Sequence, residues 1–482
     1  MMRSLFLQAP SFDGYDGGAG ARYQMKREVR SFWYPTWLAQ PAAMVPGSRL
    51  IDAPAHDQSW DDIKHEVDGK ELVILHTSTP SFRQDLHTAE LIRARNPGAL
   101  IGLIGAKVAV EPEVALRRSA AVDFVCRNEF DFTVKEVAEG VPLAEVKGIT
   151  WRDPAGEIVH NPDRAMLENM DDLPMVSPIY KRDLTIERYF GGYLKHPYVS
   201  FYTGRGCKSR CTFCLWPQTV GGHNYRTRSI ANVVEEVQYV LREIPQTKEI
   251  FFDDDTLTDN APRVEELARA LGAIGFGKPG FPMSWSCNAK ANVPRKTLEV
   301  MKANGCRLLL VGYESGNQKI LHNIKKGLLV EVAKRFSKDC RELGIVVHGT
   351  FILGLPGETL ETIEETIAFA KEVNPHTLQV SLAAPYPGTF LYKQAVENDW
   401  FDGGDHLLTE GGTQIAQLSY PHLPASVIFD KVEEFYKRFY FRPSKMAAIL
   451  GEMFRDWDMM KRRLREGVEF FSFLRNRKQA AA

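Results

Sequence analysis

Three cysteines lie within eight positions, at Cys207, Cys211 and Cys214, with the spacing C-x3-C-x2-C. Three thiolates on one loop can each ligate a different iron of a cubane 4Fe–4S cluster. The fourth iron then has no protein ligand, and an open coordination position is typical of a catalytic metal centre. We therefore predict a catalytic iron–sulfur site at these cysteines.

A structural zinc site is the alternative, with His223 completing a Cys3His set. Zinc motifs normally pair two cysteines with two further ligands across a longer gap, so the spacing favours the cluster. Gly204 and Gly206 would let the backbone wrap closely around it. The other cysteines stand in or beside apolar runs, which indicates core side chains, at Cys126, Cys287, Cys306 and Cys340.

The first 145 residues alternate between strand and helix patterns. This rhythm is typical of an open parallel sheet covered on both faces, and we predict a Rossmann-like domain over residues 1–145. The predicted strands are Ser4–Gln8, Glu71–His76, Leu100–Gly105 and Ala121–Cys126. A hairpin and a Pro-rich linker follow, over residues 146–190.

A second strand–helix rhythm predicts a partial (β/α)6 barrel over residues 191–395. Its six predicted strands are Tyr198–Thr203, Glu249–Asp253, Met283–Cys287, Arg307–Tyr313, Val346–Leu353 and Thr377–Leu382. The unusual residues, the cysteines included, follow directly after these strands. Chemistry in such barrels sits at the carboxyl ends of the strands, so the motif positions agree with the predicted fold.

The cysteine segment, with Phe213 as C-x3-C-x-aromatic-C, resembles the signature of the radical S-adenosylmethionine (SAM) superfamily. The resemblance implies that Phe213 lies beside SAM, and that an acidic segment after the second strand, with Asp254 and Asp255, holds its amino group. It further implies ribose contacts from Glu314 and Ser315, and an adenine-binding turn at Gly354. The order of these segments behind the cysteines makes the resemblance specific.

The resemblance implies a reaction. The open iron would chelate SAM, and one electron from the reduced cluster would cleave a carbon–sulfur bond. The resulting 5′-deoxyadenosyl radical would abstract a hydrogen from a substrate. A reductant such as flavodoxin or ferredoxin is implied, whereas no catalytic proton or hydrogen donor is identifiable in the sequence.

The domain order also resembles the cobalamin-binding subgroup of these enzymes. On that resemblance, Ser78 and Thr79 occupy its nucleotide loop, and Gly105 and Glu129 its Gly-rich and acidic turns. The Asp-x-His-x-x-Gly motif that supplies an axial histidine is absent, and His56 has the wrong spacing for it. Two alternatives stay open: a cobalamin site without a histidine ligand, or a fold that has lost the cofactor.

Residues 396–482 are predicted to be helical. Residues 431–478 contain 13 Lys and Arg against 7 Asp and Glu, interleaved with aromatic side chains. Contact with anionic lipid headgroups is one interpretation; an aromatic core beneath a solvated charged face is the other, and it is the more common arrangement. The aromatic run Arg30–Leu38 also has two interpretations: it lies over a substrate crevice, or it packs as core.

The whole chain carries 60 basic and 61 acidic residues, so charge does not favour nucleic-acid binding. The N-terminus has no signal-peptide pattern, and no apolar stretch approaches the length of a spanning helix. Clustered cysteines without an export signal indicate a reducing compartment. We expect a cytoplasmic enzyme, with the inner membrane face as the place where the C-terminal helices would make their contact.

The opening residues Phe6–Gly14 and the run Ser31–Pro41 resemble the radical SAM proteins associated with hopanoid biosynthesis, member J of that gene set. This resemblance implies radical ring contraction on a hopanoid side chain, forming bacteriohopanetetrol cyclitol ether. A cobalamin-dependent radical SAM methyltransferase is the second hypothesis. A non-enzymatic, zinc-dependent interaction protein is the third.

Overall fold

The computed structural model describes residues 1–11, 31–400, 416–453, 464 and 467–468. Its strands are β1 (Ser4–Gln8), β2 (Arg49–Asp52), β3 (Leu72–His76), β4 (Leu100–Ile104), β5 (Phe124–Cys126), β6 (Ile149–Arg152), β7 (Ile158–His160), β8 (Tyr198–Phe201), β9 (Gly204–Arg205), β10 (Arg226–Thr227), β11 (Glu249–Phe252), β12 (Ser284–Ala289), β13 (Cys306–Glu314), β14 (Val346–Leu353) and β15 (Thr377–Leu382).

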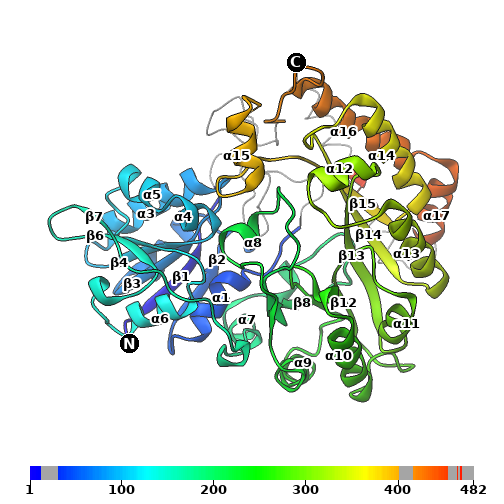
Figure 1. The fold of residues 1–482 in the computed structure, drawn as a ribbon. Coiled ribbons are helices and arrows are strands. Elements are labelled where there is room, and N and C mark those ends of the chain that lie inside the picture. Colours follow the sequence, from blue (N-terminus) through cyan, green and yellow to red (C-terminus); the bar gives the residue numbers. More distant parts are fainter. Residues whose placement is uncertain (12–30, 401–415, 454–463, 465–466, 469–482) are drawn as a thin grey trace.

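The helices of the described residues cover two sheets (Figure 1). They are α1 (Thr36–Ala43), α2 (Trp60–Ile63), α3 (Phe82–Arg95), α4 (Ala106–Val110), α5 (Pro112–Arg118), α6 (Asp131–Ala138), α7 (Ser177–Asp183), α8 (Leu215–Thr219), α9 (Ile230–Glu243), α10 (Ala261–Ala273), α11 (Arg295–Ala303), α12 (Gln318–Asn323), α13 (Val330–Leu343), α14 (Leu360–Val373), α15 (Phe390–Glu397), α16 (Ala425–Tyr440) and α17 (Pro443–Met453).

The N-terminal sheet has seven strands in the order β2-β1-β3-β4-β5-β6-β7, and its first five strands are parallel. Alternate residues of β1 enter different cores: Phe6 packs on one face, and Leu5 and Leu7 on the other. Both faces are therefore covered, as the strand–helix rhythm predicts. Strand β2 and helix α1 were not among the predicted elements, because Pro41 and a short apolar run obscure their patterns.

The hairpin expected in the region between the domains instead extends this sheet. Strand β6 pairs antiparallel with β5, Phe124 opposite Trp151, and β7 pairs antiparallel with β6. A hairpin that adds to a sheet edge satisfies backbone groups that would otherwise face solvent. The N-terminal sheet thus reaches residue 160, beyond the predicted boundary at 145.

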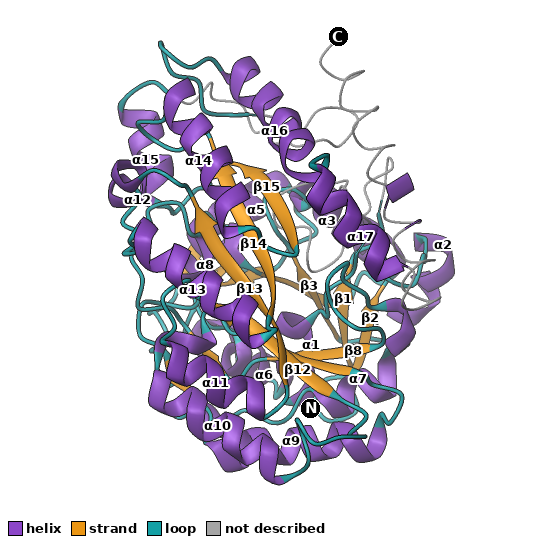
Figure 2. Cartoon of the chain, turned by 90° about the vertical axis from the view of Figure 1, so that its right-hand side faces the viewer, coloured by secondary structure: helices purple, strands orange, loops and turns teal. Residues whose placement is uncertain are grey.

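The second sheet has six parallel strands in the order β15-β14-β13-β12-β11-β8. All six lie where the sequence predicts them, within a few residues at each end. Helices α9, α10, α11, α13, α14 and α16 form a row along one face (Figure 2). The edge strand β15 is covered by α16, because the hydroxyls of Tyr436 and Tyr440 accept the N–H groups of Val380 and Leu378, each at 2.9 Å.

The aromatic run near residue 34 is core and not an open crevice. Phe32, Tyr34 and Trp37 are each at most 9% exposed, and the Tyr34 ring stacks on Tyr189 at 4.2 Å. The Tyr34 hydroxyl donates to the carbonyl of Tyr198 in β8, so the run joins the two sheets. This corrects the interpretation that placed it over a substrate crevice.

Most of the C-terminal aromatic residues that the structure describes also pack as core, whereas Phe441 is 49% exposed. Phe435 and Phe439 of α16 are fully buried, and Lys431 and Arg438 pair with Glu364. The aromatic positions that lie outside the described residues are Phe454, Trp457, Phe470, Phe471 and Phe473. No helix of the described part is long and apolar enough to cross a membrane.

Candidate functional site

The predicted cluster loop lies at the carboxyl edge of the second sheet, directly after β8. Cys207 and Cys211 are buried and Cys214 is half-buried. The loop is held by its own backbone: the Cys207 N–H donates to the carbonyl of Gly222 at 3.2 Å. The Gln218 side chain donates to three carbonyls, those of Cys211, Thr212 and Cys214. The three thiols are therefore fixed on one rigid loop.

The backbone conformation and the close packing at Gly206 require glycine there. Gly206 has φ +89°, and a Cβ placed there would lie 2.4 Å from the carbonyl oxygen of Asn224 and 2.9 Å from that of Gly221. A side chain would displace the returning strand of the loop. The structure thus supports the role predicted for Gly206, close approach of the backbone beside the first cysteine.

The surroundings of the thiols suit iron ligation. Burial raises the pKa of Cys211, and the neighbouring Lys326 opposes this shift. Burial also raises the pKa of Cys214, together with Asp255 and the two other thiols of the loop. Thiols that repel one another as anions in a buried loop need a cation to replace their protons, which iron supplies.

Among the described residues, no three His, Cys, Asp or Glu side chains converge on a single metal ion. A cubane cluster does not need such convergence, because each thiolate binds a different iron. The zinc alternative does need it. The bond between Nδ1 of His223, its proposed fourth ligand, and the backbone carbonyl of Ser209, at 2.9 Å, does not separate the two alternatives, because a metal-bound histidine makes the same kind of bond. The geometry of the described part therefore favours the cluster over zinc.

The two predicted acidic SAM contacts have different surroundings. Asp254 is fully buried, and its carboxylate accepts from Thr203 N–H at 2.6 Å and from the Tyr225 hydroxyl at 2.6 Å. These bonds give Asp254 a role in holding β8 and the returning loop strand. Asp255 lies beside Cys214, close enough to raise its pKa. Of the two, Asp255 is therefore the one that lies near a cysteine of the loop.

The predicted ribose residues follow β13. Glu314 adopts φ +63° and pairs with Lys326, Oε1 to Nζ at 2.7 Å. This pair lies against the cluster loop, since both side chains affect the pKa of Cys211. Ser315 is different: its buried hydroxyl is 3.1 Å from Thr366 Oγ1 and accepts the N–H of Asn317. It joins the end of β13 to helix α14.

Gly354 and Phe213 complete the predicted SAM contacts. Gly354 has φ +85°, and its N–H donates to Glu358 Oε2 at 2.6 Å. The same carboxylate oxygen accepts the N–H of Leu355, so Glu358 shapes the turn after β14. Phe213 is half-buried against the core. The predicted SAM contacts all lie in segments at the carboxyl edge of the second sheet.

Lys326 is a site residue that the sequence analysis missed. Burial lowers its pKa, but Glu314 and Cys211 raise it more, and the net pKa is raised. A buried ammonium group beside the cysteines can balance the negative charge of a thiolate-ligated cluster. Nothing in the sequence pattern separates Lys326 from the adjacent Lys325, because its position depends on how α12 docks.

The predicted cobalamin loop residues lie together at the carboxyl edge of the N-terminal sheet. Ser78 and Thr79 follow β3 and are half-buried, and Gly105 follows β4. A Cβ at Gly105 would lie 2.1 Å from the carbonyl oxygen of Thr77, so the two turns are in close contact. At the same edge, the buried Gln8 Oε1 makes no hydrogen bond within the described residues.

Glu129 and His56 have structural partners. The carboxylate of Glu129 is paired in a bidentate manner with Arg226, at 2.7 and 2.8 Å. His56 Nδ1 lies 2.9 Å from the carbonyl of Asp52, and its Nε2 accepts the N–H of Thr185. Both ring nitrogens of His56 are therefore occupied, as expected for a residue that is not a cobalt ligand.

Residues 201–370 match the family model described as the Radical SAM superfamily. The chain thus contains a radical SAM domain, and the protein is an enzyme with a 4Fe–4S cluster and SAM as cofactors. Its relatives include an uncharacterised methyltransferase of Pyrococcus horikoshii, 29% identical over 89% of this chain and 92% of that protein. The cytidylyl-2-hydroxyethylphosphonate methyltransferase of Streptomyces wedmorensis is 27% identical over 67% of this chain and 65% of that protein.

Two solved structures share the fold across both sheets. One is the cobalamin-dependent SAM radical enzyme OxsB with aqua-cobalamin and SAM bound, with a TM-score of 0.70 and 15% identity. The match covers all of this chain and 72% of OxsB. The other is the radical SAM methyltransferase TsrM from Kitasatospora setae, with cobalamin and a [4Fe–4S] cluster bound. Its TM-score is 0.66 at 15% identity, covering 92% of this chain and 90% of TsrM.

Proposed function

We propose that the protein is a cobalamin-dependent radical SAM methyltransferase. One observation carries the proposal: the carboxyl edge of the N-terminal sheet is joined directly to the cluster loop, through α4 against α8 and Glu129 against Arg226. Ligands of open α/β sheets bind at that edge. A cofactor held there would lie beside the cluster. The methyltransferase relatives support this choice over ring contraction.

The residues at that edge fit a cobalamin. Ser78 and Thr79 offer hydroxyls to its nucleotide tail, Gly105 allows close backbone approach, and Gln8 offers an unpartnered carbonyl oxygen. Because His56 is held by Asp52 and Thr185, it would not serve as the lower ligand of cobalt. When bound, the cobalamin would carry a methyl group between SAM and the substrate.

At the cluster loop, Cys207, Cys211 and Cys214 would hold three irons, and SAM would bind at the fourth. When bound, the cluster supplies one electron to the SAM sulfonium. Asp255 and Glu314, which lie near the cysteines, would orient SAM, and Lys326 would offset the charge of the thiolates. The buried walls of the loop exclude water from the reacting atoms.

The test uses the full chain, reconstituted anaerobically with iron and sulfide. Supplied with cob(I)alamin and SAM, it should form S-adenosylhomocysteine, which requires no knowledge of the methyl acceptor. The readout is mass spectrometry of SAM-derived products, with and without cobalamin. A protein that binds no cobalamin, yet releases 5′-deoxyadenosine when given hopanoid extract, would reject this proposal and favour the hopanoid ring contraction implied by the sequence resemblance.

A further inference from the structure

A short two-stranded ribbon closes the base of the cluster loop. Strands β9 and β10 pair antiparallel, with Arg205 opposite Arg226 and Gly204 opposite Thr227. The chain between them, residues 206–225, includes all three cluster cysteines. The position of the loop therefore depends on what holds this ribbon.

Two buried arginines of the ribbon pair with the N-terminal domain. Arg205 is 2% exposed and binds Asp131 through both amino groups, at 2.5 and 3.2 Å. Arg226 binds both carboxylate oxygens of Glu129. Arg205 Nη1 also lies 3.7 Å from Glu129, which links the two pairs into one network. The four charges sum to zero, and each of the four side chains is at most 7% exposed.

The carboxylates come from a single turn, where β5 ends and α6 begins. This turn lies at the carboxyl edge of the N-terminal sheet, the edge at which a ligand of that domain would bind. On the opposite side of Arg205, the ring of Trp37 lies under the guanidinium, 4.8 Å from centroid to Cζ. Arg205 is thus fixed on two sides by the N-terminal domain.

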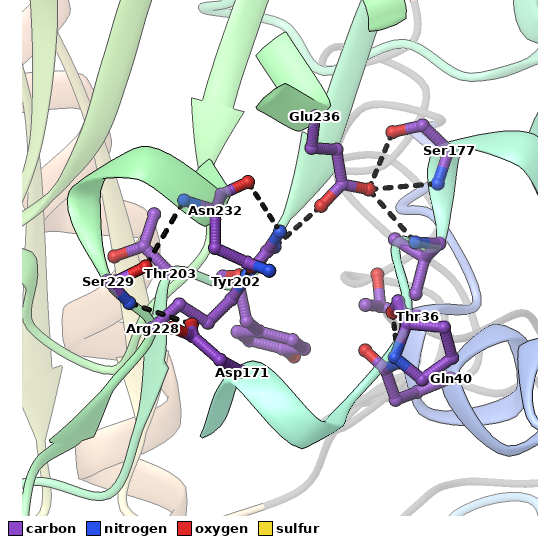
Figure 3. Close-up of polar contacts among 12 residues, drawn as sticks. Thr36, Gln40, Asp171, Ser177, Tyr202, Thr203, Arg228, Ser229, Asn232 and Glu236 are labelled. Carbon is purple, nitrogen blue, oxygen red and sulfur yellow. Dashed lines mark hydrogen bonds and ion pairs between the residues drawn. The ribbon is translucent and has the colours of Figure 1, made fainter. Parts of the chain in front are cut away.

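A second anchor holds the outer end of the ribbon (Figure 3). Arg228 pairs with the fully buried Glu236 at 2.5 Å, and its N–H donates to the carbonyl of Thr203. Glu236 in turn accepts from the N–H and hydroxyl of Ser177, at the start of α7. This anchor ties the ribbon to the segment between the two sheets.

Buried ion pairs add little net stability, because desolvation offsets their attraction, and their best-attested use is to specify one arrangement. We propose that Asp131 and Glu129, which belong to the N-terminal domain, are positioning residues for the cluster. They act through Arg205 and Arg226 to set the placement of the cluster loop against that domain. This proposal depends on the three cysteines being the ligands of the cluster. It does not depend on whether cobalamin or another ligand binds at the carboxyl edge of the N-terminal sheet.

The test is Asp131→Asn in the reconstituted full chain. The change leaves Arg205 buried without its counter-charge, two residues before Cys207. A positive charge near the cluster stabilises its reduced state, so we expect a more positive midpoint potential and an altered electron paramagnetic resonance spectrum. Iron content per chain should stay at the wild-type value. Asp163→Asn is the matched control, since Asp163 pairs with Arg127 within the N-terminal domain and is 71% exposed.

The double variant Asp131→Leu with Arg205→Met separates charge from placement, and it tests the idea if the single variant fails to fold. Removing both charges should return the potential toward wild type, while the resonance spectrum remains altered because the loop has lost its anchor. The proposal is rejected if a folded variant keeps the wild-type potential and spectrum. It is also rejected if cluster content and thermal stability fall together, while the protein that still carries a cluster has the wild-type spectrum.

Discussion

Single residues decide whether the cysteine loop can bind metal. Cys207, Cys211 and Cys214 share one loop, whereas Cys340 is an equally buried cysteine in helix α13. Burial raises the pKa of Cys211 and of Cys340 alike. The difference lies in the neighbours, because Cys211 has two other thiols and Lys326 beside it.

The first prediction concerns Cys211→Ala. Two thiolates cannot hold a cubane with one open iron, so the visible absorbance of the cluster and the reductive cleavage of SAM should both be lost. Absorbance spectra and product analysis after reconstitution measure the two effects. Cys340→Ala, the control, should retain both. Turnover of SAM by the Cys211 variant would show that the ligand assignment is incorrect.

The second prediction concerns Glu358 and pH. Burial raises the pKa of Glu358 from 4.5 to about 8, although the N–H groups of Gly354 and Leu355 lower it in part. The folded state therefore holds this proton more tightly than the unfolded state. The contribution to the free energy of unfolding is complete below pH 4.5 and is lost as the pH rises to about 8.

Glu358→Gln keeps an acceptor for both N–H groups and cannot ionise. Between pH 5 and 8, the free energy of unfolding in urea should fall less steeply with pH for the variant than for the wild type, because the contribution of Glu358 is absent. At pH 8 the variant should be the more stable protein. Unfolding curves at several pH values measure this. Equal slopes for the variant and the wild type would contradict the prediction.

At the scale of elements, the strands of the second sheet bring the candidate site residues together at their carboxyl ends. The six parallel strands of the second sheet bring their carboxyl ends to one edge, so segments separated by more than 100 residues meet there. Thus the loop after β8 meets Asp255 after β11 and Glu314 at the end of β13. Backbone conformation in the connecting loops then sets the final position.

The third prediction tests the backbone of the cluster loop. Gly206→Ala should cost stability and cluster content, because the new Cβ would lie 2.4 Å from a backbone oxygen in addition to the strain at φ +89°. Gly156→Ala is a close control, with the same φ and no atom within 4 Å. It should cost only about 1 kcal/mol of stability and no iron. Iron analysis and thermal unfolding distinguish the two variants.

Across the whole molecule, one core connects the two sheets. The same buried cluster contains Phe6 of β1, Tyr198 of β8 and the intervening Tyr34, and it continues to Phe439 of α16. The N-terminal sheet therefore shares one face with the second sheet, and its other face has a separate core against α3 and α5. We expect the two sheets to unfold as one cooperative unit.

The fourth prediction follows from that shared core. Tyr34→Ala removes a ring stacked on Tyr189 and a hydroxyl bonded to the Tyr198 carbonyl, and should cost about 3 kcal/mol. Hydrogen exchange should accelerate in both sheets, for example in β3 and β13. Leu329→Ala, at a 54% exposed position, should change neither. Acceleration confined to the N-terminal sheet would contradict a single cooperative unit.

Local patterns of spacing and alternation were enough to predict the cysteine motif and ten strands close to their final bounds. Which of the carboxylates lies beside the cysteine loop depends instead on tertiary packing. Asp254 and Asp255 are adjacent and chemically equivalent in sequence, yet the first is bonded to Thr203 and Tyr225 and the second lies beside Cys214. The same reason applies to Glu129 and Lys326: a charged side chain takes its role from partners distant in the chain, and those partners are set by how the two sheets pack.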